Sequence, residues 1–384
     1  MNERRVFVTA LALALGAAIS LGLARFSYAL LLPPMRAELG WSYFTAGAMN
    51  TVNAMGYLVG ALLLPRALAK LDARTIFLAG GWGAALLLAL HGFARSEALL
   101  YALRGLTGVA SAATFASGGL LAARLGQQPG ARPSLVLGLY YGGTGLGIVA
   151  SSLIVPPLTW PVAWQGLALA ALAATLAMGW GTRPLAAAPM AAAARGAGFS
   201  ARDFAFGLAG YLMFGLGYIG YMTFIVTLLR EQGASGATVV AFYILLGCGV
   251  IASSWLWAPL LQRYRGGQPL ALLNALLAVA TLLPVLSAHP LAVFASGALF
   301  GAVFLSLVAS TTALVRHNLP PAAWPAGIAA FTSIFAAGQI VGPSLVGWVA
   351  DGAGGLARGL AVSAGVLALG ALLATRQRAL KQPL

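Results

Sequence analysis

The chain has 384 residues, of which 60% are hydrophobic and only 8% are charged. A soluble globular domain carries about 25% charged residues, because its surface must be wetted. This composition therefore excludes a soluble enzyme, a disordered chain and a secreted disulfide scaffold. The single cysteine, Cys248, excludes an intramolecular disulfide. We expect a protein whose solvent is the lipid bilayer.

Twelve apolar runs are long enough to cross the hydrocarbon core, which takes about 20 residues per helix. The runs are 6–32, 43–64, 75–94, 98–123, 135–156, 162–180, 204–229, 237–261, 269–287, 290–315, 325–349 and 354–375. Because lipid offers the backbone no hydrogen-bond partner, each run must form a helix. The sequence predicts an all-α integral membrane protein, with the first helix ending at Pro33-Pro34.

The 22 basic residues outnumber the seven acidic ones and give a formal net charge of +15. If the N-terminus lies inside, sixteen basic residues fall on the inner side and four on the outer side. Arg25 and Arg104 lie within spans. This asymmetry predicts that both termini lie in the cytoplasm. It also explains the charge without a nucleic-acid partner, because the basic residues are spread over short segments beside anionic lipid.

The segment 181–203 divides the chain into two sets of six spans. It is rich in Ala, Gly and Pro, carries three arginines and is longer than any other connection. We expect an N-terminal six-helix bundle over 1–180, a cytoplasmic linker over 181–203 and a C-terminal six-helix bundle over 204–384.

The two halves also show a weak internal repeat at an offset of 193 residues. Gly22 falls on Gly215, and Gly145 falls on Gly338. Gly56 with Gly249, and Gly108 with Gly301, share the same offset. Such a repeat is typical of transporters with parallel halves, in which the substrate site lies at the repeat interface near the midplane.

Along nearly its whole length, the chain resembles the major facilitator superfamily. The first helix contains Gly22-x-x-Arg25-Phe26-x-Tyr28, followed by Pro33-Pro34-Met35, and the seventh contains Gly215-x-x-Tyr218-Ile219-Gly220-Tyr221. These motifs resemble the YbfB/YjiJ-like bacterial branch. The resemblance implies a fold of two pseudo-symmetric six-helix bundles and transport by alternating access.

Other superfamily motifs are matched only in part. Arg104 and Gly108 match the helix-four signature R-x-x-x-G. The basic loop between the second and third helices is degenerate, and the resemblance implies a gating role for its charged residues, Arg66, Lys70, Asp72 and Arg74. In the helix-five signature of drug/proton antiporters, Gly143 replaces the proline and Leu146 replaces a glycine, which disfavours an antiporter.

Arg25 and Arg104 are the most informative charged residues. Each lies six residues from the middle of its span, about 9 Å at 1.5 Å per residue, and both fall on the outer side of the midplane. A cation within the hydrocarbon faces a partner, water or a substrate. No acidic residue lies in the middle of any span. We therefore expect a positively charged pocket for an anion, because the planar guanidinium suits a carboxylate.

Structural roles for the two arginines remain as alternatives. Arg25 would then extend to the outer surface past Tyr28, and Arg104 would hold backbone carbonyls of the first helix. Tyr28 is also a candidate substrate contact, because it belongs to the same motif as Arg25.

Tyrosines in the seventh helix offer a second candidate surface. Tyr211, Tyr218 and Tyr221 lie on one helical face. In the repeat, Tyr218 aligns with Arg25. We expect an aromatic wall that contacts the apolar body of a small organic anion. The alternative is a tyrosine stripe that packs between helices.

Several polar residues are weaker candidates for the same site. Asn53 shares a face with Asn50 and Tyr57, and packing between the halves is a stronger expectation for it than cavity lining. Tyr140 is a candidate substrate contact. For Gln339, a hydrogen bond in a gate is the stronger expectation and contact with the substrate the weaker one. The three histidines are far apart, without a second ligand at metal spacing, so neither a metal nor a cofactor is expected.

The sequence as a whole predicts a secondary active transporter rather than an enzyme. We expect a monomer that moves a small organic anion, coupled to protons or to exchange. Asp351 and Glu38 are candidate coupling acids at the span edges. The alternatives are proton-driven efflux of drugs or amphiphilic metabolites, lysolipid flipping, and a membrane-embedded enzyme or sensor.

Overall fold

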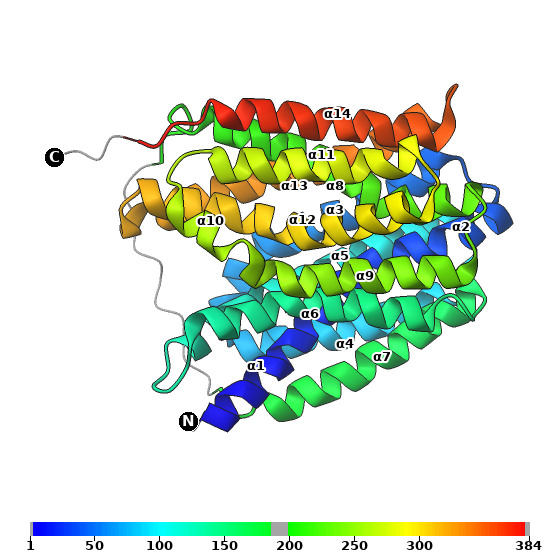
Figure 1. Ribbon diagram of the computed structural model, residues 1–384. Helices are drawn as coiled ribbons and strands as arrows, with labels where there is room; N and C mark the ends of the chain where they lie inside the picture. The colour runs from blue at the N-terminus through cyan, green and yellow to red at the C-terminus, as the bar shows by residue number, and fades with distance from the viewer. Residues whose placement is uncertain (1–2, 186–198, 381–384) are drawn as a thin grey trace. The chain divides into compact units, whose positions relative to one another are not determined.

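A computed structural model describes residues 3–185 and 199–380, and every regular element in these ranges is helical (Figure 1). Twelve segments are long and apolar enough to cross a membrane. They are Glu3–Leu39 (α1, η1 and α2), Tyr43–Leu68 (α3), Ala73–His91 (α4), Glu97–Gly126 (α5), Pro133–Ile154 (α6), Trp160–Gly181 (α7), Ala205–Glu231 (α8), Gly236–Arg263 (α9 and α10), Gln268–Leu286 (α11), Pro290–Asn318 (α12), Pro321–Ala350 (η2 and α13) and Gly355–Thr375 (α14). The all-α prediction with twelve spans is confirmed.

The predicted span ends agree with the structure within four residues, with one exception. The first span was predicted to end at Pro33-Pro34, but helix α2 (Tyr28–Leu39) contains both prolines and continues to Leu39. Proline lacks the N–H donor and so weakens a helix, but its fixed φ is compatible with a helical backbone. The helix therefore continues through both prolines, and the predicted end is wrong. In lipid, a weakened helix remains less costly than an open backbone.

Two spans consist of more than one helical segment. The first has a regular helix α1 (Glu3–Ala17), a π-helix η1 (Ala18–Phe26) and then α2. The eighth is interrupted at Trp257, between α9 (Gly236–Leu256) and the short α10 (Ala258–Arg263). The indole Nε1 of Trp257 donates to the carbonyl of Ala302 at 2.7 Å, which anchors this interruption to α12.

The helices form two compact units. The first contains α1, η1, α2, α4 to α7, the part of α3 from Val52 onward and α9 as far as Ile251. The second contains the start of α3 up to Thr51, helix α8, the end of α9 and helices α10 to α14. Each unit thus includes a helical segment from the other half of the chain. Most of the predicted linker, residues 186–198, lies outside the described residues.

Glycines allow close helix packing in the two units. In the first unit, a Cβ placed on Gly147 of α6 would lie 2.8 Å from the Cα of Gly22 in η1. In the second, a Cβ on Gly215 of α8 would lie 3.2 Å from the Cα of Gly338 in α13. Small residues permit such backbone approach in membranes. Gly22 and Gly215 are partners in the sequence repeat, whereas the repeat partner of Gly338 is Gly145, which packs on Gly247 of α9.

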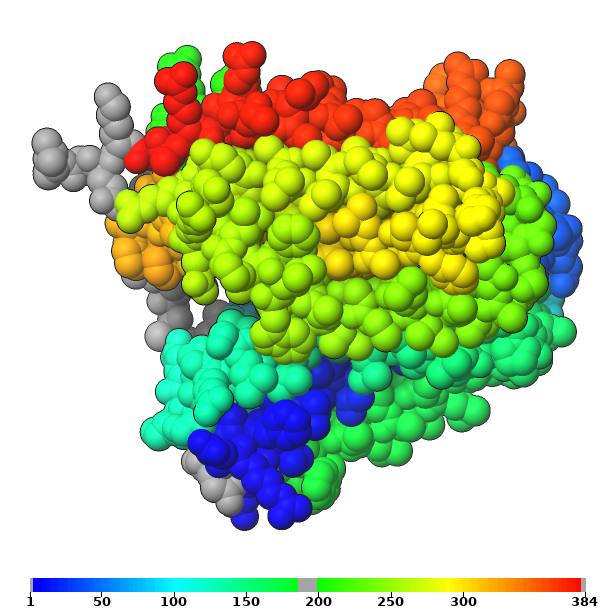
Figure 2. All heavy atoms as spheres, viewed as in Figure 1, coloured from blue at the N-terminus to red at the C-terminus, as the bar shows by residue number. Residues whose placement is uncertain are grey.

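Apolar side chains remain exposed on the outer helices of the second unit. Helices α11 and α14 run side by side, and α11 and α12 lie on the face shown in Figure 2. These helices carry exposed apolar residues, among them Leu272, Val279, Leu286, Leu291 and Leu372. Exposed leucine and valine along whole spans suit contact with lipid tails. In the first unit, Cys248 of α9 is also exposed.

Candidate functional site

Arg25 and Arg104 both lie inside the first unit. Arg25 belongs to η1 and is 4% exposed, and Arg104 belongs to α5 and is 1% exposed. All seven acidic residues of the chain lie at helix ends or in connections, so the middle of the spans carries only positive formal charge. Two buried guanidinium groups on neighbouring helices are an unusual concentration of cationic charge at membrane depth.

The contacts of Arg104 match the alternative in which it holds the backbone of the first helix. Its Nη1 donates to the carbonyl of Ala24 in η1 at 2.9 Å. Its guanidinium carbon lies 4.7 Å from the centre of the Tyr28 ring. A π-helix leaves carbonyls away from the usual i→i+4 ladder, so a charged donor at this point satisfies the backbone.

The surroundings of Arg25 differ from the sequence interpretation. Tyr28 lies against Arg104, and Arg25 is only 4% exposed, so its side chain does not extend to the surface. One aromatic neighbour of Arg25 is Tyr57 of α3, whose ring centre lies 6.0 Å from the guanidinium carbon. Arg25 therefore lies beside α3, whereas Arg104 contacts the backbone of the first span.

Asn53 and Tyr140 connect helices within the first unit. The amide of Asn53 donates to the carbonyl of Arg104 at 3.0 Å and so joins α3 to α5. The hydroxyl of the fully buried Tyr140 donates to the carbonyl of Phe115, joining α6 to α5. Packing between the halves was predicted for Asn53, but this contact is within one unit. In the second unit, Asn50 donates to Thr223 at 2.8 Å.

An aromatic cluster lies between α8 and α13 in the second unit. Phe335 of α13 stacks on Tyr211, Phe214 and Tyr218 of α8, with ring centres 5.0, 5.2 and 5.5 Å apart and interplanar angles of 19°, 10° and 17°. Sequence analysis missed Phe335, which is half-buried, and Phe214. Phe214 was detectable from its spacing of three and four residues from the two tyrosines, whereas nothing in the sequence placed α13 against them.

Tyr221 stacks on a different aromatic side chain from Phe335. The Tyr221 hydroxyl is 2.6 Å from the hydroxyl of Ser296, and its ring stacks on Phe300 of α12 with centres 4.0 Å apart. Tyr221 therefore packs against α12, and Phe304 of the same helix stacks on Tyr218 with ring centres 6.1 Å apart. Gln339 is buried in α13 beside Gly338.

The predicted gating residues fall into two groups. Asp72 caps α4 by accepting from the N–H of Thr75 at 3.0 Å, and hydrogen bonds from Thr75 hold the pKa of its carboxyl below the ordinary value of 3.8. Arg74 donates to the carbonyls of Thr182 and Gly179 at 3.2 and 2.7 Å, which ties the start of α4 to the end of α7. Arg66 and Lys70 are exposed.

Acidic side chains organise the opposite end of α3 in the second unit. The carboxylate of Asp351 accepts from the backbone N–H groups of Tyr43 and Phe44 at 2.7 and 2.9 Å. The hydroxyl of Tyr43 donates to Glu231 at the end of α8. A carboxylate suits the positive N-terminal end of a helix. Asp351 therefore anchors α3 to α13.

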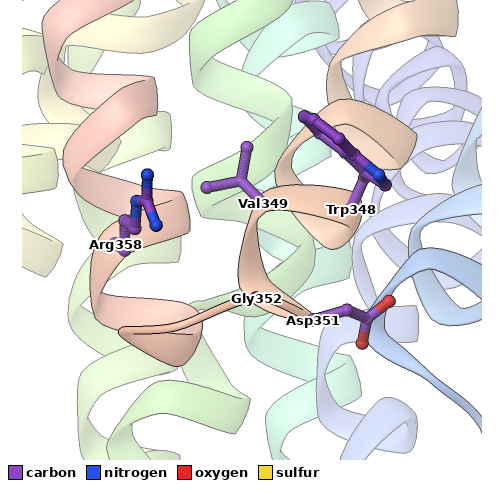
Figure 3. Close-up of a pocket in the computed structure, with 5 residues that line it drawn as sticks. All are labelled: Trp348, Val349, Asp351, Gly352 and Arg358. Atoms are coloured by element: carbon purple, nitrogen blue, oxygen red, sulfur yellow. The ribbon is translucent and has the colours of Figure 1, made fainter.

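The same aspartate lines a shallow pocket of about 340 Å³ with Trp348, Val349, Gly352 and Arg358. Asp351 points away from Arg358 in Figure 3, and Arg358 donates instead to the carbonyl of Ala353 at 3.1 Å. The charged groups of Asp351 and Arg358 therefore do not converge on one point of the pocket. The other proposed edge acid, Glu38, accepts from the indole of Trp160 at 2.7 Å in the first unit.

Replacing Asp351 is expected to weaken the anchorage of α3. Losing a helix N-cap costs about 1 kcal/mol, so Asp351→Ala should lower the thermal unfolding midpoint of the detergent-purified protein by about 2 °C. Asp351→Asn keeps an oxygen acceptor without the charge and should lie between Asp351→Ala and wild type. Equal midpoints for all three proteins would contradict this role.

Within the described residues, no group of three or more His, Cys, Asp or Glu side chains lies close enough to hold a metal ion. His91 is fully buried, with its Nδ1 2.7 Å from the carbonyl of Leu87 and its ring stacked on Trp164. His91 therefore packs inside the first unit.

Solved structures share this fold at low sequence identity. The nucleoside transporter NupG (D323A mutant) aligns with a TM-score of 0.77 and 16% identity, covering 96% of this chain and 99% of that one. A bacterial homologue of the human lysosomal transporter Spinster, inward-facing and unoccupied, aligns with a TM-score of 0.70 and 14% identity, over 97% and 95% of the two chains. The human organic anion transporter MFSD10 (TETRAN) aligns with a TM-score of 0.64 and 17% identity, over 97% and 99%.

At these identities the structural matches establish the fold alone. No curated protein matches the chain in sequence. The model of one protein family, described as "Uncharacterised MFS-type transporter YbfB", matches residues 17–375, which is nearly the whole chain. The family is one of transporters. The chain therefore belongs to the YbfB-type family of the major facilitator superfamily, and it is a multi-pass membrane transporter for a small molecule.

Proposed function

We propose that this transporter moves a small organic anion by alternating access across the bacterial inner membrane, with both termini in the cytoplasm. The observation that supports the substrate class is the pair of buried guanidinium groups in the first unit. All acidic residues lie near the ends of the spans or outside them, so none is at the depth of this pair. Arg25 binds the carboxylate of the substrate, and its planar fork provides two parallel donors. Arg104 holds the helix that carries Arg25.

The coupling mechanism follows from the same distribution of charge. With the acidic residues at helix ends, a carboxylic acid that carries its own proton needs no acidic carrier in the middle of the spans. Transport would then be driven by a pH gradient or by exchange for another anion. Fold similarity to the human organic anion transporter MFSD10 agrees with this class, although it shows the fold alone.

Uptake into proteoliposomes tests the proposal. The purified protein would be reconstituted and offered radiolabelled aliphatic and aromatic carboxylates, with the amide of each acid as a neutral control. We expect at least one carboxylate to enter faster when a pH gradient or a preloaded anion is present, and its amide to be excluded. Uptake of amides as fast as the acids would contradict an anion site.

The aromatic cluster of the second unit favours a second candidate substrate class. Phe335 stacks almost parallel on Tyr211, Phe214 and Tyr218, an arrangement that suits a flat ring of a solute. One protein of similar fold is the nucleoside transporter NupG. Nucleosides therefore belong in the same uptake panel. If unlabelled nucleosides, but not unlabelled carboxylates, reduce the uptake of a labelled substrate, the nucleoside class is favoured over the carboxylate class.

A further inference from the structure

The π-helix η1 places Arg25 in an unusual backbone. All nine residues from Ala18 to Phe26 are buried, and the N–H of Ser27 donates to the carbonyl of Gly22, five residues earlier, at 3.0 Å. The π-helix is rare, occurs mostly as single turns and is frequent at functional sites. A nine-residue π segment therefore needs support from its neighbours.

That support is concentrated on both sides of Arg25. The carbonyl of Leu23 accepts from the Ser27 hydroxyl at 2.6 Å. The carbonyl of Ala24 accepts from Arg104, and the carbonyl of Phe26 accepts from the hydroxyl of Tyr243 at 3.2 Å. The carbonyls immediately before and after Arg25 are thus each held by a side chain from another helix.

Tyr243 is the donor that sequence analysis did not identify. It lies on α9, it is fully buried, and its ring packs against Phe242 with centres 6.2 Å apart. The segment of α9 that carries it belongs to the first unit, although α9 comes from the C-terminal half of the chain. A helix from the second half of the sequence therefore contacts the backbone next to Arg25.

We propose that Tyr243 is a positioning residue for the anion site: its hydroxyl, together with Arg104, holds η1 in the π register and thereby fixes the direction in which Arg25 points. A return from the π register to the α register shifts the helix by one residue, which turns the following side chains by about 100°. The role in anion binding rests on the proposed function, whereas the role in holding η1 does not.

Removing the single hydroxyl by Tyr243→Phe tests this proposal. The matched control is Ser306→Ala, which also removes a buried hydroxyl that donates to a carbonyl of α9, that of Ser253 at 2.8 Å. Two measurements are made on the purified full-length proteins: hydrogen exchange of peptides that cover residues 18–27, and KM and kcat for carboxylate uptake. Ser27→Ala is a second variant acting on the same segment.

We expect Tyr243→Phe and Ser27→Ala each to speed amide exchange in η1 about threefold to tenfold, the effect of one hydrogen bond. KM should rise by a similar factor, with kcat within about twofold of wild type. Ser306→Ala should change neither. If Tyr243 had a structural role alone, its replacement would lower the amount of folded protein, and KM would not rise at a nearly constant kcat.

The failures are distinguishable. Unchanged exchange in η1 for Tyr243→Phe overturns the proposal whatever the transport result. Faster exchange with an unchanged KM overturns the link to Arg25. If the wild type transports no carboxylate, the proposed function fails, and exchange in η1 still decides whether Tyr243 holds the segment.

Discussion

Arg25→Ala should reduce kcat/KM for carboxylate uptake about 10-fold to 100-fold. The reason is that a hydrogen bond to a charged group contributes about 1.5–3 kcal/mol, and each 1.4 kcal/mol is a factor of about ten. Arg25 is 4% exposed in η1, and alanine removes its guanidinium donors from this position. Initial uptake rates in proteoliposomes measure the effect directly.

Two further variants separate charge from geometry. Arg25→Lys keeps the positive charge but loses the planar fork, so its activity should lie between those of the alanine variant and the wild type. Arg358→Ala changes an exposed arginine that donates to a nearby carbonyl, and it should retain wild-type uptake. Carboxylate uptake that survives Arg25→Ala undiminished would end the anion proposal.

Gly147→Ala should destabilise the folded protein strongly. The added Cβ would lie 2.8 Å from the Cα of Gly22 and closer still to the carbonyl of Ala18. Both neighbours are backbone of η1, so the π-helix itself must move. Overpacking of this kind costs about 1–3 kcal/mol or more. We expect a thermal unfolding midpoint several degrees lower and a smaller yield of monodisperse protein.

The matched control for that variant is Gly365→Ala. Gly365 lies within α14, and an added Cβ there meets nothing within 4 Å. Because alanine favours a helix over glycine by about 1 kcal/mol, this variant should be as stable as the wild type or more so. If both variants unfold at the same temperature, η1 and α6 do not pack as closely as described.

The fold was predictable from sequence because hydropathy alone defines the spans in lipid. Twelve apolar runs predicted the helices, and motifs around Gly22 and Gly215 indicated the family. The π-helix was not predictable, because no sequence pattern separates the π register from the α register. Its register depends on donors such as Tyr243, more than 200 residues away in the chain.

The candidate site was predictable only in its residue types. Arg25 and Arg104 stood out because charge is rare within spans, and both are buried as expected. Their partners depend on which helices meet, so the sequence did not show that Tyr28 pairs with Arg104. For the same reason it did not show that Phe300 of α12 stacks on Tyr221.

The exposed thiol of Cys248 gives this transporter a native position for a spectroscopic label. It is the only cysteine in the chain, and it lies on α9 five residues after Tyr243. A small membrane-permeant thiol reagent that carries a nitroxide would report on this helix without any mutagenesis. Such a label would allow the response of α9 to added solutes to be followed in real time on the unmodified sequence.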